Sequence, residues 1–178
     1  MESVASRYAL ALVKLAEETS SLSLMHKQLQ AMQTMLNQDP SWFAFLKNPF
    51  YTKIQKEAFI QTVFPVETWS SLMSFLRLLL KNHRMNALPS IVHEGIRLCE
   101  TELHIKHGTI YVATALSNAQ QRAIETALAS RLDVTLRLTQ HIEPSLLGGF
   151  RVDIEGKVYD ASVLGKLEAL TRHLKQRG

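Results

Sequence analysis

The 178-residue sequence predicts a mostly α protein with a C-terminal α+β part, in which an N-terminal six-helix bundle is followed by a small mixed-sheet module. Two observations carry this prediction. In the first hundred residues, apolar side chains recur at intervals of three and four, which is typical of amphipathic helices. In the last seventy, apolar and polar residues alternate, which is typical of half-buried strands. We place the bundle at residues 1–105 and the module at residues 106–178.

Three helices are expected in the first fifty residues. Apolar stripes run over residues 4–16 and 22–36, and the break that ends the second stripe reaches Pro40. Ser41 can cap a short third helix, since its hydroxyl can accept a hydrogen bond from a free backbone amide. Pro49 stops that helix, because the residue before a proline disfavours the helical conformation.

Three more helices complete the predicted bundle. Thr52 and Gln55 have the spacing of a capping box, which favours a fourth helix starting there. A fifth helix is expected over about residues 66–81. The sixth starts near Pro89, since proline suits the first turn of a helix. Six helices joined by short loops are typical of a compact antiparallel bundle.

A helix between two strands is expected at the start of the C-terminal module. Apolar and polar residues alternate over residues 109–116, which predicts the first strand. Ser117 can cap a helix over about residues 119–131. The alternation returns over residues 134–139 and predicts the second strand.

A third strand, a tight turn and a short fourth strand follow. Residues 150–154 alternate, and Glu155-Gly156 can form a hairpin turn, since glycine tolerates the positive φ that such turns need. Residues 158–160 return as the fourth strand. Asp160 or Ser162 then caps a last helix, whose apolar stripe is Val163, Leu167, Leu170 and Leu174. The module is therefore a small mixed sheet with helices on one side.

The composition excludes several classes of protein. The formal net charge is +4, but Lys and Arg form no run of the kind that nucleic-acid readers usually carry. Cys99 is the only cysteine, so an intramolecular disulfide is impossible and a reducing compartment is favoured. Apolar clusters such as residues 78–80 are far shorter than the ~20 residues of a membrane-spanning helix. We expect a soluble protein, or one held at a membrane through a partner.

The glycines do not form a phosphate-binding loop. Such a loop requires Gly, four residues, and then Gly-Lys-Ser/Thr, so that backbone amides surround the anion. Neither residues 156–157 nor residues 165–166 are followed by Ser or Thr. Gly148 and Gly149 indicate instead a bulge or a close backbone approach at the start of a strand. We therefore expect no nucleotide cofactor.

No metal site or catalytic group is expected either. His104 and His107 lack the further ligands that a zinc site needs. Asp160 and Ser162 could suggest a nucleophile beside a carboxylate. At a junction between a strand and a helix, however, an Asp-x-Ser sequence more often caps the helix, because its side-chain oxygens accept hydrogen bonds from free amides.

The first and fifth helices carry more apolar residues than one core-facing stripe requires. These residues are Tyr8, Ala9, Leu12, Val13 and Leu15 in the first helix, and Leu72, Phe75, Leu76, Leu78, Leu79 and Leu80 in the fifth. One interpretation is a central fifth helix that is buried on all sides. The other is an exposed groove between the two helices, which receives an amphipathic helix of a partner.

Three stretches carry a family resemblance. They are Arg7-Tyr-Ala-x-Ala-Leu12, residues 78–89 with the sequence LLLKNHRMNALP, and residues 146–167, which include Gly148, Gly149, Asp160, Ser162 and Lys166. In these stretches the chain resembles the delta subunit family of bacterial F-type ATP synthase, the counterpart of the mitochondrial oligomycin-sensitivity-conferring protein. The domain order is similar over the whole length. Ala161 is a small departure, since members of the family often have glycine there.

The resemblance implies a non-catalytic subunit of the peripheral stalk, or stator, with no cofactor. Such a subunit links the catalytic headpiece to the membrane-anchored b subunits, so that rotor torque drives ATP synthesis. It implies a location on the cytoplasmic face of the bacterial inner membrane, where the chain is peripheral, is held through the complex and is a monomer within it.

The resemblance also implies two partners. The N-terminal bundle would grip the N-terminal helix of an alpha subunit in a groove of its first and fifth helices, and Tyr8, Ala11, Leu12 and Leu78 are the candidates for that groove by position. The C-terminal module would meet the C-terminal ends of the paired b subunits.

Two alternatives belong to other classes. A small basic RNA-binding module would expose aromatic residues on its sheet for base stacking, but Tyr111 and Phe150 are few and far apart for that purpose. An enzyme would use Asp160, Ser162 and one of the histidines. A serine-reactive probe tests the second alternative, and we expect no labelling.

Overall fold

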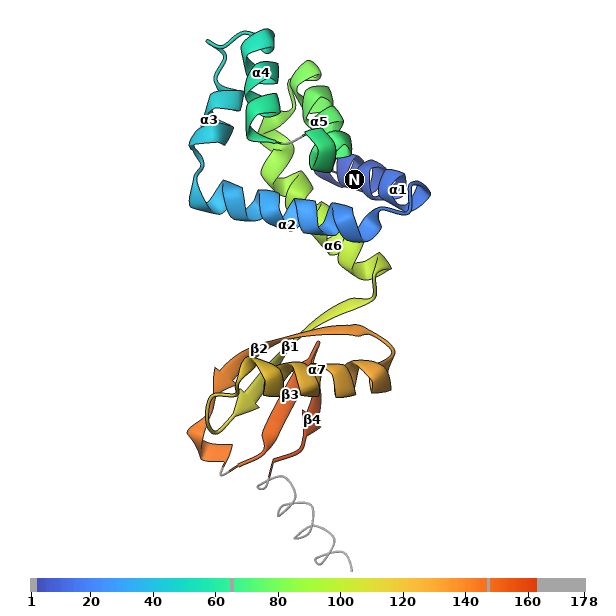
Figure 1. Ribbon diagram of the computed structural model, residues 1–178, viewed down its shortest axis with the longest axis vertical. Coiled ribbons are helices and arrows are strands. Elements are labelled where there is room, and N and C mark those ends of the chain that lie inside the picture. Colours follow the sequence, from blue (N-terminus) through green and yellow to red (C-terminus); the bar gives the residue numbers. More distant parts are fainter. Residues whose placement is uncertain (1–2, 65, 147, 163–178) are drawn as a thin grey trace, which may run out of the picture. The chain divides into compact units, whose positions relative to one another are not determined.

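The computed structural model describes residues 3–64, 66–146 and 148–162, with residues 66–68 described by their backbone alone (Figure 1). Internal contacts divide the chain into two compact units, Met1–Leu103 and His104–Gly178. The described part is mostly helical and ends in a small mixed sheet of four strands. Seven α-helices are counted in it, of which six precede the sheet.

The first unit contains helices only, among the residues described. They are α1 Val4–Glu18, α2 Leu22–Gln38, α3 Ser41–Lys47, α4 Lys53–Val63, α5 Val66–Lys81, a short 3₁₀ helix Met85–Ala87, and α6 Leu88–Glu102. The bounds of α5 and the start of α6 agree with the sequence-based expectation. The additional 3₁₀ helix, and a kink in α5 where Trp69 leaves helical geometry, are departures from a simple six-helix arrangement.

Side-chain caps explain where several helices begin. The Ser3 hydroxyl accepts a hydrogen bond from the Ser6 amide at 3.1 Å and so starts α1. Thr52 and Gln55 form the capping box that their spacing predicted for α4. In both cases a side-chain oxygen satisfies an amide that has no partner within the helix.

The prediction that Ser41 caps α3 is wrong, because Ser41 lies inside the helix. Ser41 is the first residue of the helix, and Pro40 in the capping position makes no side-chain hydrogen bond. The Asp39 carboxylate accepts instead from the Ser41 amide at 3.0 Å. Hydrogen bonding from the side chain and backbone of Ser41 lowers the pKa of Asp39. A carboxylate is favoured here because its charge also interacts well with the positive end of the helix.

The core of the first unit is formed mainly by α1, α2, α5 and α6. Its fully buried side chains include Ala9, Leu29, Met32, Leu72, Leu76, Leu79, Leu88 and Ile91. The stripes that periodicity indicated in α1, α2 and α5 therefore do face a common interior.

The second unit is a four-stranded mixed sheet covered by a helix on one face (Figure 1). Its elements are β1 Ile105–Val112, α7 Asn118–Leu132, β2 Thr135–Ile142, a 3₁₀ helix Pro144–Leu146, β3 Phe150–Ile154 and β4 Lys157–Asp160. The strand order is β2-β1-β3-β4. The β1–β2 pair is parallel and needs α7 as its crossover, whereas the two other pairs are antiparallel.

The first strand lies four residues earlier than expected. The pattern of residues 109–116 predicted a strand, but β1 ends at Val112, where its pairing with β2 and β3 also ends. Beyond that point the Leu116 amide donates to the Gln140 side chain at 2.8 Å, so this amide has a hydrogen-bond partner without pairing to another strand. The Ser117 cap and its helix are confirmed, with Gln120 completing a capping box.

The two faces of the sheet have opposite character. One face carries Ile110, Leu136, Leu138, Val152 and Ile154, which pack with α7 into a second buried cluster. The Glu125 carboxylate accepts from the Leu138 amide at 2.9 Å, and Gln121 donates to the Leu138 carbonyl at 2.7 Å. These bonds attach α7 to β2. The other face is polar and includes Thr109, Tyr111, Thr139, His141, Arg151 and Asp153.

Candidate interaction site along α1 and α5

The predicted groove residues differ in how much surface they offer. Ala11 is exposed and Tyr8 is half-buried, whereas Leu12 is only 3% exposed and belongs to the core. On α5, Leu78 is 45% exposed. The interpretation that α5 is buried on all sides is therefore wrong, since one of its sides reaches solvent.

Tyr8 joins α1 to the end of α5. Its ring meets Phe75 edge-to-face, with 6.1 Å between the ring centres. Its hydroxyl accepts a hydrogen bond from the Asn82 side-chain amide at 3.1 Å. Phe75, Leu78 and Asn82 are three and four residues apart, so they occupy one face of the helix and its immediate extension.

Exposed apolar side chains flank this contact on both helices. On α1, Ala11 and Leu15 follow Tyr8 at helical spacing, and Leu15 is 45% exposed. On α5, Leu78 follows Phe75 by three residues. We call these five residues, Tyr8, Ala11, Leu15, Phe75 and Leu78, the α1–α5 edge. It is an apolar strip on two helices that are joined through a tyrosine, and it contains no group that could carry out bond chemistry.

A hollow of about 260 Å³ lies at the end of this edge where α1 begins. It is lined by Val4, Arg7, Tyr8 and Arg84. Sequence reasoning missed that the two arginines come together, because no local pattern joins positions so far apart. The one signal was that both lie in stretches that carry the family resemblance.

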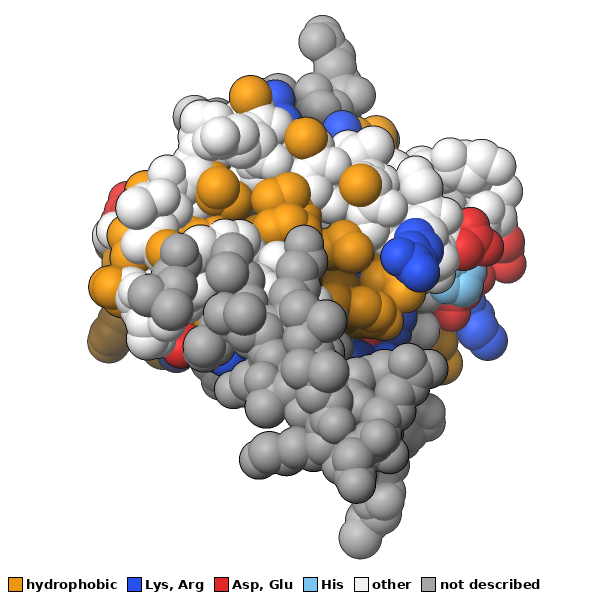
Figure 2. Space-filling model, turned by 90° about the horizontal axis from the view of Figure 1, so that it is seen from below, with side chains coloured by type: hydrophobic (Ala, Val, Ile, Leu, Met, Phe, Trp, Pro, Cys, Tyr) orange, Lys and Arg blue, Asp and Glu red, His pale blue; other side chains and the backbone are white. Residues whose placement is uncertain are grey.

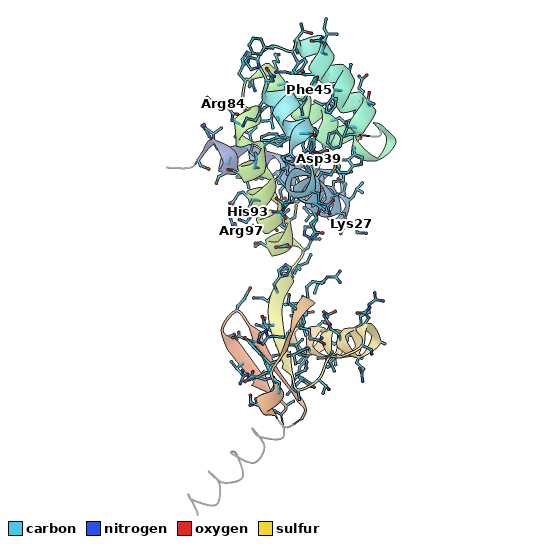
Figure 3. All side chains as sticks on the ribbon, turned by 90° about the vertical axis from the view of Figure 1, so that its left-hand side faces the viewer. Lys27, Asp39, Phe45, Arg84, His93 and Arg97 are labelled. Atoms are coloured by element: carbon cyan, nitrogen blue, oxygen red, sulfur yellow. The ribbon has the colours of Figure 1, made fainter. Side chains whose placement is uncertain are left out.

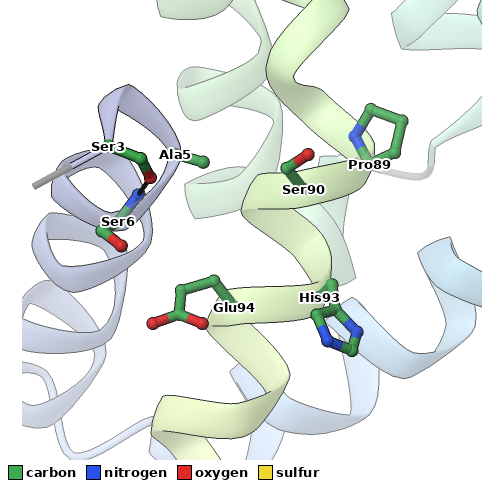
Figure 4. Close-up of a pocket in the computed structure, with 7 residues that line it drawn as sticks. All are labelled: Ser3, Ala5, Ser6, Pro89, Ser90, His93 and Glu94. Atoms are coloured by element: carbon green, nitrogen blue, oxygen red, sulfur yellow. Dashed lines mark hydrogen bonds between the residues drawn. The ribbon is translucent and has the colours of Figure 1, made fainter.

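A second hollow, of about 410 Å³, lies between the start of α1 and α6 (Figure 4). Its lining includes Ser90, His93 and Glu94, a set of residue types that could suggest a catalytic triad. Figure 4 shows His93 and Glu94 pointing to opposite sides of α6. The Glu94 carboxylate binds the Arg97 guanidinium through two hydrogen bonds of 2.7 and 3.0 Å. These bonds hold the pKa of Glu94 below its usual value. The Glu94 carboxylate is therefore bound to Arg97 and does not orient His93 as a general base.

The twin glycines allow the close approach that the sequence indicated. Gly149 has a φ of +78°, and a Cβ there would lie 2.5 Å from the Ala161 carbonyl oxygen. In the hairpin turn, Glu155 and Gly156 both have positive φ, as a primed turn requires. Residues 148–162 thus form a turn and a hairpin that bring the end of β4 against the start of β3.

Asp160 and Ser162 form a local turn. The Asp160 carboxylate accepts from the Ser162 amide at 2.8 Å, and hydrogen bonding from Ser162 lowers the pKa of Asp160. Ser162 is only 1% exposed, so its hydroxyl is closed to a substrate. This geometry does not fit a nucleophile. Lys166 and the predicted last helix lie outside the described residues.

The sheet offers no platform for stacking bases. Phe150 packs with the buried cluster, whereas Tyr111 lies on the polar face, so the two aromatics face opposite sides. Tyr111 is itself covered by the Arg151 guanidinium, 4.7 Å from its ring centre. A single covered ring does not provide the adjacent aromatics that RNA-binding sheets use.

Other reactive groups are few in the described part of the chain. Cys99 is fully buried, and burial, followed by the nearby Glu100 and Glu17, raises the pKa of its thiol to about 11. Residues 3–64, 66–146 and 148–162 contain no cluster of three or more His, Cys, Asp or Glu side chains that could hold a metal ion. Within the same residues, no helix combines the length and apolar character that crossing a bilayer requires.

Comparison with known proteins gives a consistent result. The family model of the ATP synthase delta (OSCP) subunit matches residues 4–174. The ATP synthase subunit delta of Bacillus mycoides (strain KBAB4) is 32% identical over 172 residues, which cover 96% of this chain and 95% of the relative. That of Geobacillus sp. (strain WCH70) is 30% identical over 174 residues, 97% of each chain.

The fold is also similar to that of a solved structure. A chain in the cryo-EM structure of the Toxoplasma gondii mitochondrial ATP synthase hexamer matches with a TM-score of 0.59. The match covers 97% of this chain and 98% of the other, at 18% identity. At that identity the likeness concerns the fold alone.

Proposed function

The chain belongs to the ATP synthase delta (OSCP) subunit family, and from this premise we propose that its two units attach to different partners in the enzyme. Members of this family are structural, non-catalytic components of the peripheral stalk of F-type ATP synthase. A stalk component acts by being held at both ends. We therefore expect this chain to act through two binding surfaces, one on each unit.

We infer that α1–α6 act together as one bundle that binds the N-terminal helix of an alpha subunit along the α1–α5 edge. The observation that carries this proposal is the exposed apolar strip formed by Ala11, Leu15 and Leu78 around the half-buried Tyr8. An amphipathic helix can lay its apolar face on such a strip. Each Å² of apolar surface that becomes buried contributes about 25 cal/mol, before the cost of association is subtracted.

The second unit is proposed to bind the C-terminal ends of the paired b subunits. The family resemblance of residues 146–167 supports this assignment. A further support is exposed apolar surface, which is visible in Figure 2 on the side seen from below. In the second unit, the large hydrophobic residues with high exposure in the described part are Ile142 on β2, at 51%, and Val158 on β4, at 57%. The strand register places them on opposite faces of the sheet, so they are two separate candidate contacts.

These two attachments would let the chain transmit force without performing chemistry. Held by alpha at one unit and by b at the other, the chain would resist rotation of the headpiece with the rotor, so that torque drives ATP synthesis. The proposal places it peripherally, on the cytoplasmic face of a bacterial inner membrane, as one copy per complex.

A pull-down from detergent-solubilised membranes tests the proposal. The tagged wild-type chain should recover both alpha and b subunits. Ala11→Asp should lose alpha and keep b, because it places a charge in the apolar strip without touching the core. Ala31→Asp is the matched control, since Ala31 is an exposed alanine in α2, and it should keep both partners. Recovery of neither subunit by the wild type would overturn the proposed function.

A further inference from the structure

Two arginines stand at one end of the α1–α5 edge. Arg7 and Arg84 line the same hollow as Tyr8, and both side chains are exposed. Figure 3 labels Arg84, which lies close to the beginning of α1. The two N-terminal stretches that carry the family resemblance thus meet at a single point, and each contributes one guanidinium to it.

The backbone fixes where each arginine stands. Arg7 lies in the second turn of α1, directly before Tyr8. After α5, His83 adopts a positive φ of 54° and the Arg84 amide donates to the Leu79 carbonyl at 2.9 Å, which closes the end of the helix. The hydrogen bond between Asn82 and Tyr8 then ties this end of α5 to α1.

Arg7 and Arg84 have no ion-pair partner among the residues that the structure describes. Two arginines elsewhere in the described residues form ion pairs, Arg97 with Glu94 at 2.7 Å and Arg151 with Glu143 at 2.9 Å.

The acidic residues of α1 are too distant to supply the missing charge. The first turn of α1 holds no acidic residue. Glu17 and Glu18 close the far end of the helix, about 16 Å along its axis from Arg7 at the usual helical rise. Both guanidinium groups are thus exposed beside the apolar strip, and within residues 3–64, 66–146 and 148–162 neither has an ion-pair partner.

We propose that Arg7 and Arg84 receive a carboxylate of the helix that docks on the α1–α5 edge, and that this contact fixes the direction and register of that helix. The inference rests on the proposed function. Guanidinium groups bind carboxylates in a planar, two-pronged geometry that an ammonium group does not provide. An apolar strip alone holds a helix in several registers, whereas a charge pair at one end selects among them. The partner is thus an amphipathic helix with an Asp or Glu beside its apolar stripe.

Charge reversal tests this contact. The probe is a synthetic peptide that spans the N-terminal helix of the alpha subunit encoded in the same genome, titrated against the full chain. Arg84→Glu and Arg7→Glu should each weaken binding about tenfold or more, as expected when one partner of a close charge pair is reversed. The control is Arg122→Glu, an equal change of charge at an exposed position of α7, and it should leave the affinity within about twofold. The melting temperature of each variant verifies that the fold is retained.

Substitutions in the peptide locate the partner charge. Replacing its acidic residues one at a time by lysine should identify one position that weakens binding to the wild type. The same lysine peptide should bind Arg84→Glu more tightly than the unmodified peptide does. Such a reciprocal rescue would not arise from a merely structural role of the arginine.

The possible failures are distinguishable. If Arg84→Glu, Arg7→Glu and Arg122→Glu all bind the peptide as the wild type does, while Ala11→Asp abolishes binding, the charge contact is wrong and the docking edge stands. If no acidic position of the peptide affects the affinity, the charge contact is likewise wrong. If the wild-type chain does not bind the peptide at all, both the charge contact and the proposed alpha site are overturned.

Discussion

Truncation of Leu78 tests the docking edge with the least disturbance of the fold. Leu78 is 45% exposed on α5, so the part of its side chain that a partner could cover is known. Complete burial of a leucine side chain contributes about 1.5–3 kcal/mol, so covering the exposed 45% contributes about 0.7–1.3 kcal/mol. Leu78→Ala should therefore weaken binding of the alpha N-terminal peptide about three- to tenfold.

Leu24 provides the matched control. It lies on α2, outside the α1–α5 edge, and is 47% exposed, so Leu24→Ala removes almost the same amount of accessible side chain. Isothermal titration of the full-length variants with the peptide gives both dissociation constants. The variants should melt close to the wild type, because neither change opens a cavity in the core.

Two outcomes of this comparison would contradict the assignment of Leu78 to the docking edge. If Leu24→Ala and Leu78→Ala change the dissociation constant equally, the loss at Leu78 is not a contact with the peptide. The same conclusion follows if Leu78→Ala binds as the wild type does. Either result would refute the assignment of this side of α5 to the partner helix.

Three further predictions concern the second unit and the buried thiol. Gly149→Ala should lower the free energy of unfolding by at least about 2 kcal/mol, because it combines a positive φ with a Cβ 2.5 Å from a carbonyl oxygen. Gly156→Ala is the comparison, since a Cβ there meets open space, and it should lower the free energy of unfolding by only about 1 kcal/mol. Thermal unfolding measures both. The lowered pKa of Asp160 gives stability that is present above about pH 4 and is lost as the pH falls through the folded-state pKa. Asp160→Asn should therefore flatten the acid side of a plot of melting temperature against pH. An unchanged plot would contradict this prediction. Cys99 should resist thiol reagents near pH 8 until the chain unfolds, because burial raises the pKa of its thiol to about 11 and the side chain is fully buried. Rapid labelling of the native chain would contradict this prediction.

Local patterns identified most of the helices because their signals are themselves local. A capping box at Thr52 and Gln55, or a proline near the start of α6, acts within one turn. The cap of α3 shows the limit of such reasoning, since Ser41 lies inside the helix and the Asp39 carboxylate binds its amide. The position of β1 shows another limit, because its end is set by partners on β2 and β3 and not by its own alternation.

The candidate site could be predicted only in part. Periodicity indicated that α1 and α5 have surplus apolar residues, but it does not distinguish Leu12, which fills the core, from Leu78, which reaches solvent. That distinction depends on how the helices pack. The meeting of Arg7 with Arg84 depends on the path of the whole first unit, and no spacing rule within one helix would have found it.

Cross-linking in the assembled enzyme tests most directly the claim that the two units bind different subunits. Single cysteines introduced by Ala11→Cys and Val158→Cys carry a thiol-to-photoreactive reagent, and the native Cys99 stays unlabelled because it is buried. After illumination, mass spectrometry identifies the subunit joined to each position. The account predicts that position 11 is joined to alpha and position 158 to b. Products that join position 11 to b, with none to alpha, would contradict it.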